Sequence, residues 1–176
     1  MNAGGCDDRD LRFGTEWNAK AVTAAMTGAC QCGELRFDLT DKPLFVHACH
    51  CVKCQKSSGS VFGITTIILE SDIRISTGSL TIEPMAAAPH RLRHLCAECR
   101  DHIYTTATNH PATALLRNGT LDDPRQLLID AHIFVKRKRP WLSLPEDVLQ
   151  FPAGYDREKA WPTDSLARLK QATMGP

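Results

Sequence analysis

Residues 28–37, with the sequence GACQCGELRF, join a closely spaced cysteine pair to the start of a β-strand. Gly28 and Gly33 flank Cys30 and Cys32, and their backbone freedom helps both sulfur atoms to point inward. Beyond the pair, apolar and polar side chains alternate, as in a strand that buries one of its faces. This stretch therefore predicts a β-sheet that begins beside a metal-binding turn.

Strand signals of the same kind recur along most of the chain. Short runs of β-branched and apolar residues are separated by turn residues, and Asn118-Gly119 is a strong turn signal. Near the C-terminus, Thr163 or Asp164 is expected to cap a helix with Leu166 and Leu169 on one face. The sequence therefore predicts a mainly β protein with a short C-terminal helix. The expected strands are residues 35–39, 44–48, 61–69, 73–76, 80–85, 91–95, 103–106, 112–117 and 129–135.

The length of 176 residues suits one domain with a sizeable core. We expect residues 1–26 to be a flexible extension, residues 27–152 a zinc-binding β domain, and residues 153–176 a tail that carries the helix. The beginning of the chain is unlike a secretory signal and no apolar stretch is long enough for a bilayer, so we expect a soluble, cytoplasmic protein. The net charge of +1 gives no reason to expect nucleic acid or a membrane as partner, and homo-oligomerisation is left open.

Eight cysteines in a chain without an export signal indicate metal binding or catalysis rather than disulfides. Cys30, Cys32, Cys96 and Cys99 form two short pairs, which can offer four thiolates to a tetrahedral zinc at about 2.3 Å each. Joining the pairs closes a loop of 63 residues, from 33 to 95, at a cost of roughly 3–4 kcal/mol. Structural zinc contributes about 10–16 kcal/mol, so this closed site is expected to hold the two halves of the fold together.

The second group, Cys49, Cys51 and Cys54, supplies three thiolates and has no obvious fourth ligand. Catalytic zinc sites typically use three protein ligands and keep one position open. Three soft ligands favour a soft fourth one, such as an incoming thiol, which zinc would hold as a thiolate. The spacing therefore predicts a second zinc and thiol activation.

Other interpretations of the cysteines stay open. His50 or His47 would convert the second group into a closed structural site, and Cys51 and Cys54 would alternatively form a redox-active disulfide. Spacing alone also allows other pairings between the two groups. Cys6 is expected to be an incidental free thiol in the extension.

The cysteine motifs, taken in order, resemble those of the glutathione-dependent formaldehyde-activating enzyme family, which includes the centromere protein V-like domain. The resemblance implies a β-tent fold, in which two twisted antiparallel sheets are held by a structural zinc. It also implies two zinc ions per chain and a carbon–sulfur lyase that forms S-hydroxymethylglutathione from glutathione and formaldehyde. A non-catalytic, zinc-stabilised binding module is the alternative function. The matching segments are residues 28–37, 49–59, 96–99, 119–124 and 132–135, followed by Pro140-Trp141.

The resemblance implies that Cys30, Cys32, Cys96 and Cys99 bind the structural zinc. It implies that Cys49, Cys51 and Cys54 bind the catalytic one. The family usually has glycine after the third cysteine motif, where this chain has Arg100. A non-glycine residue at positive φ costs roughly 1 kcal/mol, so we expect this turn to be either strained or differently shaped.

Three further features have candidate roles. His132 is expected either to make a structural hydrogen bond or to support the open zinc site. The basic run of residues 136–139 would receive the carboxylates of glutathione, direct the protein to the nucleus, or simply end a strand in solvent. Trp141 and Trp161 are expected to pack the C-terminal segment onto the sheet.

Overall fold

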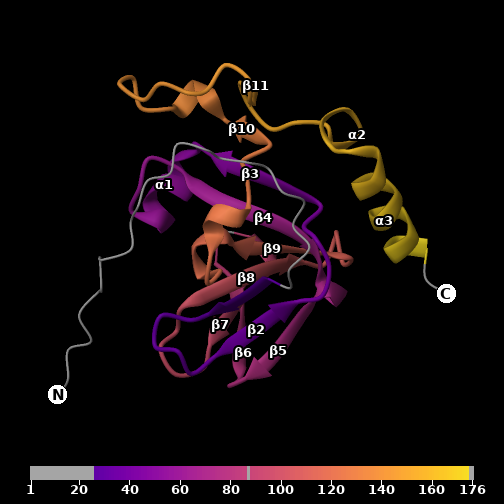
Figure 1. The fold of residues 1–176 in the computed structure, drawn as a ribbon. Helices are drawn as coiled ribbons and strands as arrows, with labels where there is room; N and C mark the ends of the chain where they lie inside the picture. The colour runs from indigo at the N-terminus through magenta and orange to yellow at the C-terminus, as the bar shows by residue number, and fades with distance from the viewer. Residues whose placement is uncertain (1–25, 87, 175–176) are drawn as a thin grey trace.

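The computed structural model describes residues 26–86 and 88–174, which form a mainly β fold with a C-terminal helix, as predicted (Figure 1). Cys6 and nearly all of the expected N-terminal extension lie outside these residues. The strands are β1 (Met26–Ala29), β2 (Arg36–Leu39), β3 (Phe45–Cys49), β4 (Gly63–Leu69), β5 (Ile73–Thr77), β6 (Leu80–Met85), β7 (Ala88–Cys96), β8 (His102–Ala107), β9 (Thr113–Arg117), β10 (Ala131–Ile133) and β11 (Leu149–Phe151). The α-helices are α1 (Val52–Ser58), α2 (Arg157–Ala160) and α3 (Thr163–Met174). Short 3-10 turns are η1 (Glu70–Asp72), η2 (Asn118–Thr120), η3 (Pro124–Gln126) and η4 (Val135–Arg137).

The strands form two sheets, which confirms the expected two-sheet architecture. A three-stranded sheet has the order β1-β2-β5, and an eight-stranded sheet has the order β11-β10-β3-β4-β9-β8-β7-β6. Pairing is antiparallel except at one edge of the large sheet, where β10 runs parallel to both β3 and β11. The expected strand at 129–135 is shorter than predicted because Phe134 adopts a left-handed conformation with φ 55°, after which the chain turns into η4.

The two faces of the large sheet bury different sets of side chains, because successive residues of a strand point to opposite faces. On β4, Ile68 belongs to a core that also contains Phe37 of the small sheet, whereas Ile67 belongs to a second core with Phe45 and Trp161. We call the face of the large sheet that carries Ile67 the outer face. The first core therefore lies between the sheets, and the second lies between the outer face and the C-terminal helices.

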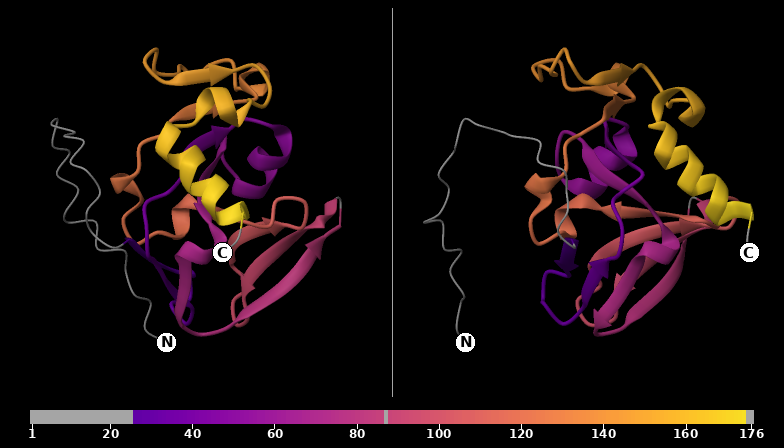
Figure 2. Two further views of the ribbon diagram at one scale, coloured as in Figure 1. Left: turned by 90° about the vertical axis from the view of Figure 1, so that its right-hand side faces the viewer. Right: turned by 45° about the vertical axis from the view of Figure 1, so that its right-hand side comes forward.

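The C-terminal helices α2 and α3 pack beside the large sheet (Figure 2). Trp161 is buried and stacks on Phe45 with ring centroids 5.8 Å apart, and Leu169 of α3 is buried in the same core. The expected packing role is thus confirmed for Trp161. It is wrong for Trp141, which is 72% exposed in the loop before β11.

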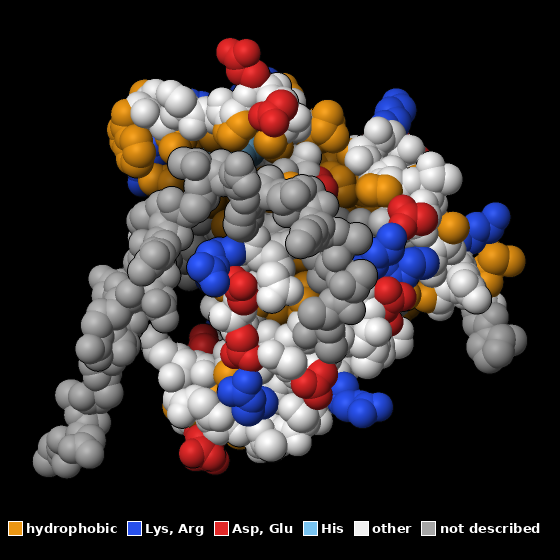
Figure 3. All heavy atoms as spheres, viewed as in Figure 1, with side chains coloured by type: hydrophobic (Ala, Val, Ile, Leu, Met, Phe, Trp, Pro, Cys, Tyr) orange, Lys and Arg blue, Asp and Glu red, His pale blue; other side chains and the backbone are white. Residues whose placement is uncertain are grey.

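The visible surface in Figure 3 carries acidic and basic side chains in alternation, in keeping with the net charge of +1.

Among the described residues, no helix is long and apolar enough to cross a membrane.

Candidate functional site

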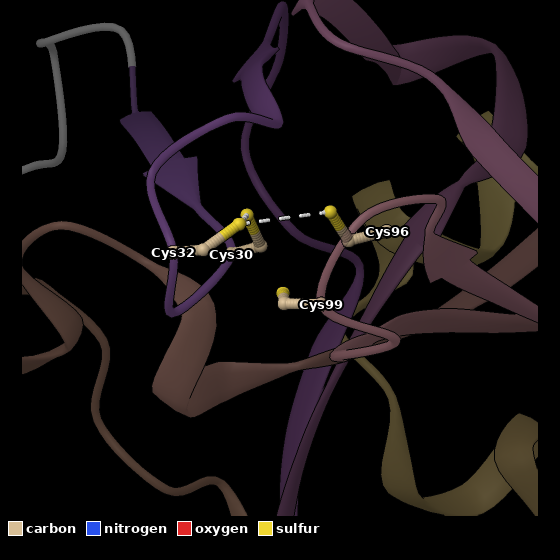
Figure 4. A group of neighbouring side chains, drawn as sticks. All are labelled: Cys30, Cys32, Cys96 and Cys99. Atoms are coloured by element: carbon tan, nitrogen blue, oxygen red, sulfur yellow. Dashed lines mark hydrogen bonds between the residues drawn. The ribbon is translucent and has the colours of Figure 1, made fainter.

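The first cysteine group comes together where the small sheet meets the large one. Cys30 and Cys32 follow β1, and Cys96 and Cys99 lie on the turn between β7 and β8, with all four side chains directed toward one another (Figure 4). The four Sγ atoms lie within 4.8 Å of one another, with 3.3 Å between Cys30 and Cys32 and 4.0 Å between Cys32 and Cys96. Tetrahedral zinc with 2.3 Å bonds needs sulfur atoms about 3.8 Å apart, so the arrangement fits such an ion.

Backbone geometry explains how the two turns present these sulfur atoms. Gly33 has φ 82°, which confirms the need for a flexible residue after Cys32. Arg100 has φ 64°, so the strained alternative predicted for this turn is the one that occurs. Its guanidinium forms an ion pair with Glu83 of β6. Gly28 differs, because its φ is not positive; a side chain there would instead collide with Phe37.

The second group, Cys49, Cys51 and Cys54, is assembled within one short segment. Cys49 ends β3, and Cys51 caps α1 by accepting the Cys54 N–H at 3.4 Å. The three Sγ atoms lie within 4.8 Å of one another. This compact arrangement also fits a tetrahedral metal, with three sulfur atoms from the described residues and one position left over.

Neither histidine near this group joins it, so no described histidine closes the three-cysteine set. His47 Nδ1 lies 3.1 Å from the Tyr155 hydroxyl. His50 is fully buried, and its Nε2 lies 3.0 Å from Nδ1 of His132. The expected hydrogen bond of His132 is therefore present, and it is made to the residue between Cys49 and Cys51. All seven cysteines among the described residues are free thiols.

A glutamine reinforces the same loop. Gln55 of α1 is buried and donates from Nε2 to the carbonyl oxygens of His50, at 2.7 Å, and Arg137, at 2.9 Å. The basic run thus contributes a backbone carbonyl to the site, while the Arg137 side chain is exposed. Nothing in one sequence marks Gln55 for this role, because its partner lies 82 residues away.

Positive charge lies beside Cys54. Hydrogen bonding with the Cys49 thiol, and then with Cys51, lowers the pKa of Cys54 to about 6 against the effect of burial, and the charges of Arg117 and Arg91 lower it further. The same Cys54 interaction raises the pKa of Cys49. Arg117 is held near α1 because its guanidinium donates to Ser57 Oγ at 3.3 Å. The sequence interpretation missed both arginines, since they come from β7 and β9.

A cleft of about 830 Å³ lies between the two cysteine groups. Cys30 of the first group lines it, and so does Gly63, where an added Cβ atom would meet Cys54 of the second group. Arg117 and His102 add polar groups to its wall. Burial, followed by the positive charge of Arg117, lowers the pKa of His102 to about 4, so this imidazole is neutral at neutral pH. Asp101 and Asp122 also line the cleft, so it can hold a polar molecule near Cys54 and offers that molecule both signs of charge.

Comparison with known proteins places these motifs in one family. A family model described as "Glutathione-dependent formaldehyde-activating enzyme" matches residues 25–137. The chain belongs to this family. The matched residues include all seven cysteines of the two groups described above.

The curated relatives are distant. A protein of Sordaria macrospora is 29% identical over 45% of this chain and 36% of its own length, and one of Emericella nidulans is 28% identical over 49% and 44%. Their names mark both as candidate glutathione-dependent formaldehyde-activating enzymes. The chain thus matches less than half the length of each. A crystal structure of a Rhodobacter sphaeroides protein aligns with 72% of this chain and 99% of that one, with 17% identity and a TM-score of 0.45.

Proposed function

We propose that the protein is a zinc-dependent carbon–sulfur lyase that joins a thiol, glutathione or a close relative, to a small electrophile such as formaldehyde. The observation that carries the proposal is the group of Cys49, Cys51 and Cys54, three sulfur atoms in tetrahedral range beside an open cleft. Membership of the formaldehyde-activating family supports glutathione and formaldehyde as the substrates. The free thiols fit a reducing compartment such as the cytoplasm.

We assign one zinc to each cysteine group, a structural zinc to the four-cysteine group and a catalytic zinc to the three-cysteine group. Zinc at Cys49, Cys51 and Cys54 would hold an incoming thiol as a thiolate at neutral pH. The hydrogen bond between His50 and His132 fixes the loop that carries Cys49 and Cys51. Gln55 fixes the same loop from the side of α1, so the three sulfur atoms keep their geometry while substrate enters.

The proposed reaction is an addition. The sulfur of the thiol forms a bond to the carbonyl carbon of formaldehyde, the C=O double bond becomes a single bond, and the thiol proton ends on the oxygen. Atoms balance, because glutathione and formaldehyde together give S-hydroxymethylglutathione. Arg117 contributes positive charge beside the cleft, which favours the anionic thiol and its carboxylates.

The test replaces zinc with cobalt, whose absorption bands report a new sulfur ligand. We expect the bands of the full-length protein to change when glutathione is added. The change should be lost in Cys51→Ser and kept in the control Cys6→Ser, which leaves all seven clustered cysteines in place. Elemental analysis of protein prepared without chelator should give two zinc ions per chain. If the cobalt absorption bands do not change on addition of glutathione, the proposed enzymatic function is refuted. The alternative, a zinc-stabilised binding module, is then favoured.

A further inference from the structure

A second, smaller cavity of about 210 Å³ lies on the outer face of the large sheet, where α2 and the residues around it cover β7, β8 and β9. Its floor is formed by strand residues such as Ile67 and Leu115, and its wall by Trp161 and Tyr155. The family motifs and the proposed reaction leave this cavity without a role.

Three cationic or potentially cationic side chains line the cavity: Arg91, His110 and Arg157. The Arg157 guanidinium lies 3.5 Å from Nδ1 of His110 and 5.8 Å from the ring centroid of Trp161. No Asp or Glu belongs to the lining, and no carboxylate of the described residues pairs with Arg91 or Arg157. Two arginines that share a cavity and have no carboxylate partner favour an anionic ligand, which planar guanidinium groups bind in bidentate fashion.

The cavity and the three-cysteine group lie on the same face of the same strand. A Cβ atom added to Gly63 at one end of β4 would meet Cys54, so this face of the strand points at the three-cysteine group, and Ile67 lines the cavity four residues further on. Residues an even number apart on a strand share a face, and the strand rise places these two about 13 Å apart. A tripeptide spans about 10 Å when extended, and arginine side chains cover the remaining distance.

We propose that this cavity binds a carboxylate of the thiol substrate and so selects thiols with a carboxylate far from the sulfur. The inference rests on the proposed function, because it takes the three-cysteine group as the place where the sulfur binds. A cavity of 210 Å³ suits a carboxylate with the atoms next to it.

The test uses Trp161 as the reporter, because it lines the cavity. The full chain has three tryptophans, so Trp17→Phe and Trp141→Phe isolate its fluorescence. The probe is S-methylglutathione, which keeps both carboxylates and has no free thiol. We expect it to change Trp161 emission, and Arg91→Gln and Arg157→Gln to weaken its binding by about tenfold to a hundredfold, the cost of a charged hydrogen bond.

The matched control is Arg74→Gln, which removes an exposed strand arginine from the small sheet and should leave the affinity unchanged. Equal affinity in wild type, Arg91→Gln and Arg157→Gln would overturn the proposal, as would unchanged Trp161 emission. Inorganic phosphate that competes as strongly as S-methylglutathione would also overturn it and mark a general anion site. Because the probe has no thiol, these results do not depend on the cobalt experiment, so the two proposals can fail separately.

Discussion

Replacing Gly28 by alanine tests how tightly the first cysteine motif is packed. A Cβ atom at this position would lie 2.2 Å from Cζ of Phe37 and 2.5 Å from the carbonyl oxygen of Thr120. Phe37 is fully buried, so its ring has no room to swing away. The backbone contact is equally fixed, because Gly28 forms a bridge with Leu121 that ties β1 to the segment after β9.

The expected cost follows from these two collisions. Overpacking in a core typically costs about 1–3 kcal/mol, and a clash with both a ring and a backbone places Gly28→Ala near 3 kcal/mol. Alanine also lowers the conformational entropy of the unfolded chain, which stabilises the folded state by about 0.4–1 kcal/mol. The free energy of unfolding should therefore fall by about 2 kcal/mol in total. For a protein of this size the melting temperature should fall by about 4–8 °C.

Thermal unfolding followed by circular dichroism, under reducing conditions and with zinc present, measures this loss. The control is Gly119→Ala, since no atom lies within 4 Å of a Cβ built there and φ is not positive. We expect the control to be neutral or slightly stabilising. A Gly28→Ala protein within roughly 0.5 kcal/mol of wild type would refute the packing argument and show that the strands shift freely at this point.

Two further predictions concern stability. Because the pKa of His102 falls to about 4 in the folded state, the unfolded chain binds the proton more tightly, and stability should drop by up to about 3 kcal/mol as the pH falls from 6.5 to 4. Urea titrations of His102→Asn should show a weaker pH dependence, and an unchanged one would contradict the assignment. Arg168 is 18% exposed and pairs at 2.8 Å with Asp72, itself 12% exposed, so Arg168→Met should cost about 2–3 kcal/mol in the same assay. Adding Asp72→Asn should recover part of that loss, and no recovery would exclude the ion pair as its source.

The cysteine groups could be predicted from the sequence because their members come in two pairs and one triplet, each on a short segment whose spacing limits the geometry. The pair of Cys30 and Cys32 and the pair of Cys96 and Cys99 needed only the further assumption that they meet, which the structure bears out. The reason given for Gly28 was wrong, since this residue provides space rather than backbone freedom. For Arg100 the sequence predicts either a strained turn or a differently shaped one, and the φ of 64° selects the strained turn.

The supporting parts of the candidate site were out of reach of the sequence. Helix α1 has only seven residues and no apolar periodicity, and a cysteine rather than a common polar residue caps it. The pair of His50 and His132 depends on β10 lying parallel to β3, a contact between segments about 80 residues apart. Periodicity reveals that a strand exists and which face it buries, but it does not reveal its neighbours.

The outer strands of the large sheet also decide how the protein behaves at high concentration. An unpaired strand edge invites a second chain to extend the sheet, which is a common route to aggregation. At one end, β6 carries Pro84 and an irregular register between Pro84 and Met85, both of which interrupt a continuous row of donors and acceptors. At the other end, β11 offers only three residues. Both edges are thus poor templates, so we expect the eight-stranded sheet to resist edge-to-edge association even though Ile82 is exposed on its rim.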